Sequence, residues 1–365
     1  MVNRHVPHHH LAKLPSFLLS PRRSSVPKKK VILDTDAGVD DAVAIIVALH
    51  LAQKHGHEIV AISTVSGNVG VDKVVKNVAQ ILNVCQRTDI PIVRGCSKPL
   101  VGPTNDASHY HGSDGLGNAN LPDPMNQIHI LEGPAAMHLT RLAKEHVGEL
   151  TLIALGPLTN VAVAIALDED FCSNLKELFW MGGCLAGPGN ITATAEFNAY
   201  ADPEALQVCL RQHCQMTWAS WELCLQNVIS WEEWDTITAS SCDAPVAQFI
   251  HHVTNIFRER RQVQLETGWN SGEIICDPIA IVTALGEVEY STIHQNVSVV
   301  TNSGVMRGTT IGDMRINELL NSRPPGAEES VVKYILPERY DNYTEILKEA
   351  ITRFGLNTTE VLMSS

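Results

Sequence analysis

The stretch VILDTDAGVDDAVAIIVALHLAQKH (31–55) carries the pattern on which the fold prediction rests. Residues 31–34 are β-branched or apolar up to an aspartate, which is typical of a buried strand. Residues 39–55 are apolar on almost every side after their acidic first turn, which indicates a buried helix. Gly38 allows a sharp turn between the two. This segment therefore predicts a strand, a tight turn and a helix.

The same alternation of short β-branched runs and helix-length segments continues along the chain. Strands are expected at 58–64, 91–95, 149–156 and 176–183, and a hairpin within 293–315. Helices are expected at 71–85 and 134–145, from Pro157, from Pro203, from about Ser230, at 277–285 and at 340–355. Polar loops are expected at 101–120 and in the stretch that ends at Asn198. This order predicts an α/β fold with an open, mostly parallel sheet and helices on both faces. Without a Pro- or Ser-rich linker, residues 30–365 are expected to form a single domain.

Residues 1–29 have a different composition, since they are basic, contain no acidic residue and are rich in Pro, His and Ser. Two interpretations are open: a mitochondrial transit segment, or a disordered extension without a role. The apolar piece at 17–19 is far shorter than the region of about 7 to 15 residues in a secretory signal. A cytoplasmic location is therefore expected, with the mitochondrion as the alternative.

Composition excludes several classes of partner. Lys plus Arg total 27 against 40 Asp plus Glu, and the net charge of −13 repels a nucleic-acid backbone. No apolar run reaches the roughly 18 residues of a membrane span. The nine cysteines are an odd number without a C-x-x-C pair, which predicts mostly reduced thiols and neither a zinc knuckle nor a disulfide framework. Neither nucleic acid nor a membrane is therefore expected as a partner.

Four carboxylates crowd the junction between the first strand and the first helix. Asp34, Asp36, Asp40 and Asp41 fall within eight positions, and their mutual repulsion would be relieved by a cation. The alternative, acidic residues in the first turn of a helix, explains Asp40 and Asp41 but not the other two. Because the local ligands are all oxygens, Ca²⁺ or Mg²⁺ fits better than Zn²⁺.

Two known carboxylate motifs are compared with this one. An EF-hand needs a glutamate at the twelfth position of its loop, and counting from Asp34 that position holds Ile45. The EF-hand is therefore excluded. A haloacid-dehalogenase-type phosphatase also begins with a strand and D-x-D and binds Mg²⁺, so it remains the alternative from another reaction class.

Further motifs follow the first one in a fixed order between residues 30 and 355. They are VILDTDAGVDDAVAI, TVSGN (64–68), HGSDGLG (111–117), GPLTNVA (156–162), MGG (181–183), AEFNAYADPEA (195–205) and DPIA (277–280). Together they resemble the inosine-uridine-preferring nucleoside hydrolases. The resemblance disfavours the phosphatase, which has no counterpart to AEFN or to the late Asp-Pro.

The resemblance implies a Ca²⁺ ion at the bottom of a ribose pocket and assembly as a homodimer or homotetramer. Carried over by position, the metal would be bound by Asp36, Asp41, Asp277 and the backbone carbonyl of Leu155. The ribose 2′-hydroxyl would be bound by Asp40 and Asn68, and the 3′-hydroxyl by Asp277 and Asn198. The 5′-hydroxyl would be bound by Asn190 and Glu196. The activity implied is hydrolysis of the N-glycosidic bond of ribonucleosides to ribose and free base.

The expected chemistry suits a site rich in carboxylates, because cleavage of an N-glycosidic bond builds positive charge on the sugar. By the resemblance, Asp36 takes the proton of a metal-bound water, although it could also act only as a ligand. His111 is expected to contact the base, and His109 is a weaker candidate for the same role. Phe197 fits either a core position or a wall of the pocket.

Cys276 departs from the family pattern. Before the late Asp-Pro, some relatives carry a His that protonates the leaving base and others a Trp that stacks on it, whereas a Cys does neither well. Trp221 and Trp269 are candidates for an aromatic wall. A non-catalytic protein that kept the nucleoside site is therefore the alternative to a hydrolase of purine or pyrimidine ribonucleosides.

Overall fold

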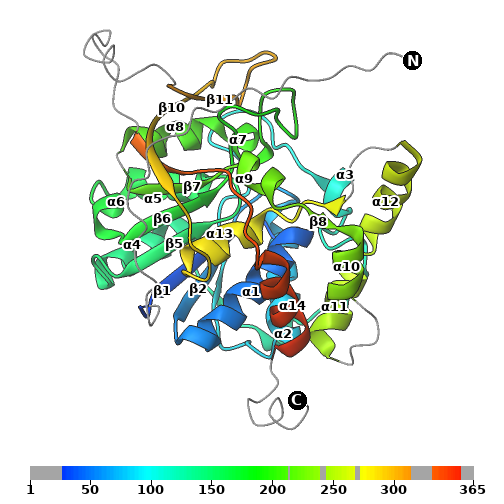
Figure 1. Ribbon diagram of the computed structural model, residues 1–365. Coiled ribbons are helices and arrows are strands. Elements are labelled where there is room, and N and C mark those ends of the chain that lie inside the picture. The colour runs from blue at the N-terminus through cyan, green and yellow to red at the C-terminus, as the bar shows by residue number, and fades with distance from the viewer. Residues whose placement is uncertain (1–26, 213, 239–243, 268–271, 314–330, 355–365) are drawn as a thin grey trace, which may run out of the picture.

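A twisted sheet crosses the centre of the molecule and carries helices on both faces (Figure 1). The computed structural model describes residues 27–212, 214–238, 244–267, 272–313 and 331–354. Most of the predicted N-terminal extension lies outside these residues. None of the described helices is long and apolar enough to cross a membrane.

The described residues contain a main sheet of ten strands. In spatial order they are β11 (Thr310–Gly312), β10 (Thr292–Val299), β12 (Val331–Ile335), β7 (Met216–Ala219), β6 (Glu177–Met181), β5 (Leu150–Ala154), β1 (Lys30–Thr35), β2 (Glu58–Thr64), β3 (Ile92–Val93) and β4 (Ile130–Leu131). The strands from β12 to β4 are parallel, and β10 and β11 add an antiparallel hairpin at one edge. A separate antiparallel pair joins β8 (Ile229–Ser230) to β9 (Gly272–Glu273).

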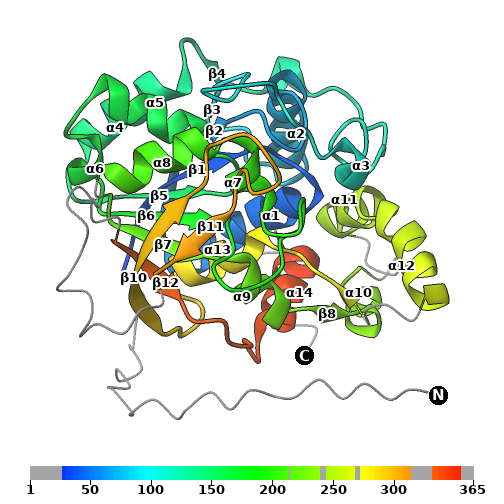
Figure 2. The ribbon, with the colours of Figure 1, turned by 90° about the horizontal axis from the view of Figure 1, so that it is seen from above.

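Two groups of helices cover the sheet, and Figure 2 shows them on opposite sides of the strands. One face packs against α1 (Val39–His55), α2 (Val71–Val84), α10 (Trp231–Ile237), α11 (Pro245–Val253), α13 (Asp277–Ala284) and α14 (Tyr343–Arg353). The other packs against α4 (Ala135–Glu145), α5 (Thr159–Leu167), α6 (Phe171–Asn174) and α8 (Pro203–Arg211). The predicted α/β fold, with an open and mostly parallel sheet in a single domain, is confirmed.

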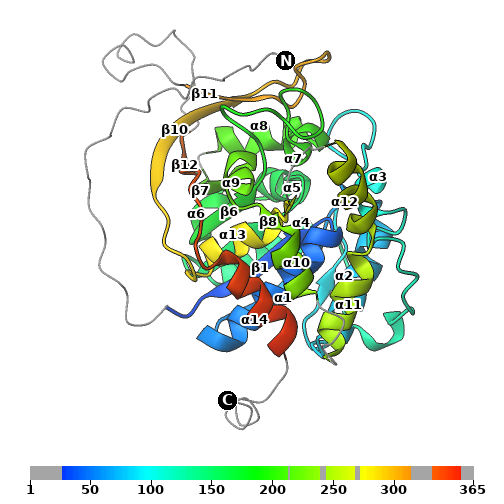
Figure 3. The same cartoon turned by 45° about the vertical axis from the view of Figure 1, so that its right-hand side comes forward.

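Further helices complete the rim at the carboxyl ends of the strands. They are α3 (Ser108–His111), α7 (Phe197–Ala201), α9 (Trp221–Gln226) and α12 (Ile256–Thr267). The 3₁₀ turn η1 (Met125–Gln127) precedes β4. Figure 3 shows α12 standing beside α3, although about 150 residues separate them in the sequence. This neighbourhood brings the C-terminal half of the chain to the same rim as the first loops.

The unit formed by β1 and α1 lies at the centre of the fold, as its sequence predicts. β1 pairs with β2 on one side and β5 on the other, and helices cover both faces, so its residues from Val31 onward are buried. α1 packs against α13 and α14 as well as the sheet, which explains why its apolar residues surround it. α1 ends at Gly56, whose φ of 69° is left-handed and suits glycine.

Several predictions are corrected by the structure. β7 and β12 were not expected, the loop at 101–120 contains α3, and the polar loop before Asn198 ends at α7. Cys172 and Cys214 form a disulfide, with 4.9 Å between their Cα atoms, and this pair is an exception to the expectation that the cysteines are mostly reduced. The six other described cysteines are free. The bonded pair is 42 residues apart in sequence, so no local motif indicates it.

Candidate functional site

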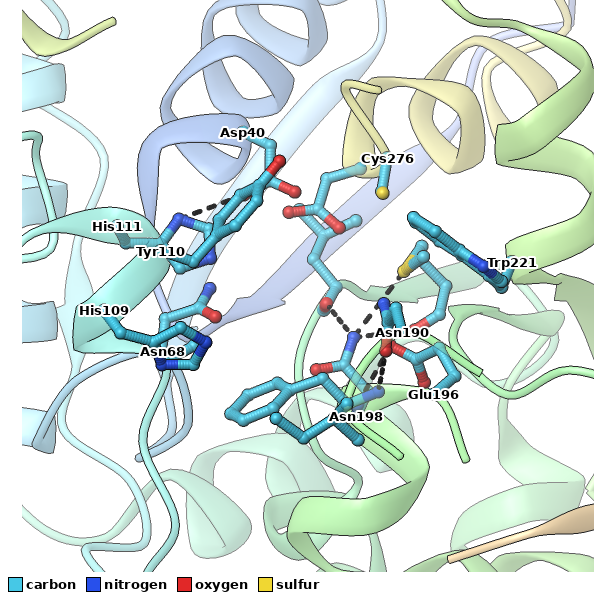
Figure 4. Close-up of a pocket in the computed structure, with 16 residues that line it drawn as sticks. Asp40, Asn68, His109, Tyr110, His111, Asn190, Glu196, Asn198, Trp221 and Cys276 are labelled. Atoms are coloured by element: carbon cyan, nitrogen blue, oxygen red, sulfur yellow. Dashed lines mark hydrogen bonds and ion pairs between the residues drawn. The ribbon is translucent and has the colours of Figure 1, made fainter. Parts of the chain in front are cut away.

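A pocket opens at the carboxyl ends of the parallel strands, where the predicted site residues meet (Figure 4). The residues of the prediction that line it are Asp40, Asn68, His109, His111, Leu155, Asn190, Glu196, Phe197, Asn198, Trp221, Cys276 and Asp277. They come from segments following β1, β2, β5, β6 and β7 and from α3 and α13. Ligands of open α/β sheets bind at this edge.

Asp41 and Asp36 are fixed by backbone and side-chain donors around the first turn of α1. Asp41 accepts hydrogen bonds from the Thr35 hydroxyl, from the Gly38 amide at 2.7 Å and from the Asn68 side chain at 3.0 Å. The Gly38 bond also caps the helix, as expected for an acidic first turn. The Oδ2 atom of Asp36 accepts a hydrogen bond from the backbone amide of Asn68 at 2.8 Å. The other oxygen, Oδ1, is buried without a partner.

Oxygen atoms of Asp40, Asp41 and Asp277 lie within 4.8 Å of one another. Burial raises the pKa of Asp40 and of Asp41 to about 6. Burial first, and then the neighbouring carboxylates Asp40, Asp41 and Asp36, raise the pKa of Asp277 well above its ordinary value. Since these anions destabilise one another, and Asp36 keeps an unpartnered oxygen, the cluster fits a divalent cation with a preference for oxygen ligands.

Asp34 has a different role from the other aspartates of its motif. Its Oδ1 atom accepts from Ser63 at 2.5 Å and from Asn160 at 2.7 Å, and it is not part of the pocket lining. These hydrogen bonds link β1 to β2 and to α5. Its other oxygen, Oδ2, is buried without a partner, so the expectation that one cation relieves all four carboxylates stays a prediction.

The opposite wall of the pocket is formed by the AEFN segment. Glu196 accepts from the amides of Gly183 at 2.6 Å, Asn198 at 2.9 Å and Ala199 at 3.1 Å, which caps the start of α7. The Asn198 side-chain amide donates to the Leu155 carbonyl at 2.7 Å. Figure 4 shows Asn190, Glu196 and Asn198 facing Asp40, Asn68 and His111 across the cavity.

His111 is a neutral donor at the rim. Its Nδ1 atom accepts from the Val39 amide at 3.1 Å, which places the ring proton on Nε2. Burial lowers the pKa of His111 to about 3, so the ring is uncharged near neutral pH.

Three residues that the sequence did not indicate support the same side of the pocket. Tyr110, which lines the cavity, donates its hydroxyl proton to Glu273 at 2.8 Å. Arg260 donates to the same oxygen of Glu273 at 3.2 Å, and its guanidinium lies 3.7 Å from the centre of the Tyr110 ring. No local pattern predicts this group, because Tyr110 of α3 is 163 residues away from Glu273 of β9 in the sequence.

Cys276 lies beside Asp277 at the start of α13 and borders the pocket. Its hydrogen bond with Cys224, followed by burial, raises the pKa of the Cys276 thiol well above its ordinary value. The thiol is therefore neutral and a weak donor. Trp221 lines the cavity, as one interpretation suggested, whereas Trp269 lies outside the described residues.

Comparison with known proteins identifies the family of the chain. The family profile described as inosine-uridine preferring nucleoside hydrolase matches residues 31–338. The chain belongs to this family. An inosine-uridine preferring nucleoside hydrolase of Leishmania major is 30% identical over 334 residues, which cover 90% of this chain and 98% of the relative. A probable uridine nucleosidase 2 of Arabidopsis thaliana is 32% identical over 286 residues, covering 78% and 85%.

The similarity to solved members of the family extends over the whole fold. An inosine-guanosine nucleoside hydrolase is 27% identical with a TM-score of 0.77, and the match covers 89% of this chain and 99% of that one. A plant nucleoside hydrolase is 26% identical with a TM-score of 0.79 over the same shares. The ordered motifs that suggested the family thus occur in a structure with the family's architecture.

Proposed function

We propose that this protein hydrolyses the N-glycosidic bond of ribonucleosides and releases ribose and the free base. The observation that carries the proposal is the pocket itself, in which a buried carboxylate cluster faces the fixed amides and carboxylate of the AEFN segment. Membership of the family and the names of its relatives, which include uridine nucleosidases, support the same activity.

The metal in this proposal is Ca²⁺, held by Asp36, Asp41, Asp277 and the carbonyl oxygen of Leu155. The unpartnered Oδ1 of Asp36 and the mutual repulsion of the buried carboxylates support a hard cation there. When bound, Ca²⁺ supplies Lewis-acid polarisation and orients sugar hydroxyls. The carbonyl of Leu155 also accepts from Asn198, but a carbonyl oxygen has two lone pairs and can serve both.

The remaining polar residues of the pocket bind the sugar in this proposal. A ribose has three hydroxyls, and holding it in one orientation needs several fixed donors and acceptors. Asp40 and Asn68 bind the 2′-hydroxyl, Asp277 and Asn198 the 3′-hydroxyl, and Asn190 and Glu196 the 5′-hydroxyl. The hydrogen bonds that fix Glu196 and Asn198 before any substrate arrives support this assignment.

Asp36 is the proposed general base. A water oxygen attacks C1′, the bond from C1′ to the base nitrogen breaks with its electron pair moving to the base, and Asp36 takes a proton from the water. The neighbouring carboxylates stabilise the positive charge that develops on the sugar. His111, with its proton on Nε2, is the proposed hydrogen-bond donor to the base, while Phe197 and Cys276 border the leaving group.

The decisive experiment measures ribose release from uridine, cytidine, inosine and adenosine, with Ca²⁺ and with a chelator. We expect release that depends on Ca²⁺. Nucleoside binding without ribose release would instead indicate a non-catalytic relative, and phosphate release from nucleotides without ribose release would indicate the Mg²⁺-dependent phosphatase. Light scattering tests the proposed homodimer or homotetramer.

A further inference from the structure

The segment at 182–196 crosses from β6 to α7 beside the pocket and contains no helix or strand. It contributes Asn190, Ile191 and Glu196 to the cavity wall. Because no sheet ladder or helix holds this backbone, its position depends on bonds to side chains of neighbouring elements.

Glu222, on α9, binds the backbone of residues 185–187 in the first half of this segment. One of its carboxylate oxygens, Oε1, accepts hydrogen bonds from three successive backbone amides, those of Leu185 at 2.6 Å, Ala186 at 2.7 Å and Gly187 at 2.9 Å. Amides that converge on one anionic oxygen form charge-assisted bonds, which are about twice as strong as neutral ones. The backbone amide of Trp221 also donates a hydrogen bond to the Gly183 carbonyl at 2.9 Å. Helix α9 therefore contacts the segment both at Gly183 and at residues 185–187.

Beyond Gly187, the backbone amides of the segment up to Asn190 bond within the loop. The amides of Gly189 and Asn190 donate to the carbonyls of Ala193 and Ala195, both at 3.1 Å. The Asn190 side chain accepts from the Phe197 amide at 2.8 Å. Among the described residues, Glu222 is thus the last anchor outside the loop on the N-terminal side of Asn190, and the Phe197 amide of α7 is an anchor on its C-terminal side.

We propose that Glu222 is a positioning residue that sets the place of Asn190 and, through it, the recognition of the 5′-hydroxyl of the ribose. This inference rests on the proposed function, because that function assigns Asn190 to the 5′-hydroxyl. Glu222 itself is not among the pocket-lining residues, so its effect on the substrate is indirect. Loss of the three hydrogen bonds to Glu222 makes the position of Asn190 less fixed and weakens the binding of substrates that carry the 5′-hydroxyl.

The test compares uridine with 5′-deoxyuridine for wild type, Glu222→Ala, Glu222→Gln and the control Glu232→Ala. Glu232 is an exposed glutamate of α10 away from the pocket. For Glu222→Ala we expect the KM for uridine to rise about tenfold, the size of one lost hydrogen bond, with kcat within about threefold. The KM for 5′-deoxyuridine should change less than about twofold, because that substrate has no 5′-hydroxyl to lose. Glu222→Gln keeps an accepting oxygen without the charge and should give an intermediate KM.

The results that overturn the inference differ from those that overturn the proposed function. Equal KM changes for the two nucleosides, or an unchanged KM for both, remove Glu222 from 5′-hydroxyl recognition while ribose release still supports hydrolysis. If the wild-type protein releases no ribose, the proposed hydrolysis is wrong. Calorimetry then gives the dissociation constants of uridine and 5′-deoxyuridine for the wild type and the Glu222 variants, and these decide whether Glu222 positions Asn190. Absence of binding then overturns it as well. If Glu222→Ala does not fold, as circular dichroism would show, Glu222→Gln carries the comparison.

Discussion

The side-chain amide of Asn198 donates a hydrogen bond to the backbone carbonyl of Leu155 over 2.7 Å. The same amide reaches the carbonyl of Met181 at 3.0 Å. A residue proposed to hold the ribose therefore also fixes a carbonyl proposed to bind the metal. The two parts of the site are joined by one side chain, and a change at Asn198 should affect both.

Asn198→Ala should raise the KM for uridine and also lower the melting temperature. The substitution removes a proposed ribose contact and leaves the carbonyls of Leu155 and Met181 without this donor in a buried place, which costs about 1 to 3 kcal/mol in the free energy of unfolding. Steady-state kinetics and thermal melts measure both effects. Asn255→Ala, at an exposed position between α11 and α12, is the control. An unchanged KM would remove Asn198 from the ribose site.

Addition of Ca²⁺ should raise the melting temperature of chelator-treated protein, with about one ion bound per chain. A ligand that binds only the folded state stabilises it by about 2.7 kcal/mol at a hundred times its dissociation constant. Elemental analysis and melting curves with Ca²⁺, Mg²⁺ and Zn²⁺ provide the measurement. Asp277→Asn should abolish most of the Ca²⁺ shift. Stoichiometric zinc in the purified protein, or the absence of any shift, contradicts this prediction.

The central strand, turn and helix could be predicted from the sequence because the pattern is local and the unit is buried on all sides. Asp36, Asp40 and Asp41 follow β1 directly, so their proximity needed no tertiary information. Asp277 and Asn198 are distant in sequence, and only the resemblance to a family placed them in the same site.

Other features depend on contacts that no sequence pattern records. The group of Tyr110, Glu273 and Arg260 is assembled from three separate segments, and none of the three stands in a recognisable motif. The hydrogen bond from Asn160 of α5 to Asp34 is another such contact, because 126 residues separate the two in the sequence. β7 escaped prediction because it is four residues long and follows α8 closely.

Asp36→Asn should lower kcat by roughly 10² to 10⁴-fold if the carboxylate is the general base. The amide keeps the shape of the side chain but cannot take a proton from the attacking water. Because Asp36 is also a proposed metal ligand, Ca²⁺ content is measured on the same sample by elemental analysis. Near-normal turnover with the metal still bound would show that another group is the base.

Cys276→Ala and Cys276→Ser should change turnover by less than about tenfold, whereas the loss of a true general acid costs 10² or more. The Cys276 thiol is hydrogen-bonded to the Cys224 thiol and is buried, and both effects raise the pKa of Cys276 well above its ordinary value. Such a thiol holds its proton too tightly, and donates too weak a hydrogen bond, to activate a leaving base. Base preference should shift modestly, because the side chain borders the pocket.

Values of kcat and kcat/KM for uridine, cytidine, inosine and adenosine on wild type and both Cys276 variants provide the measurement. Cys96→Ala, a free cysteine outside the pocket lining, is the matched control. With a poor acid at Cys276, we expect nucleosides whose base leaves easily to be cleaved fastest, since the proposed donor to the base, the His111 ring, is neutral. A thousandfold fall of kcat in Cys276→Ala, with fold and Ca²⁺ content intact, would identify the thiol as the catalytic acid.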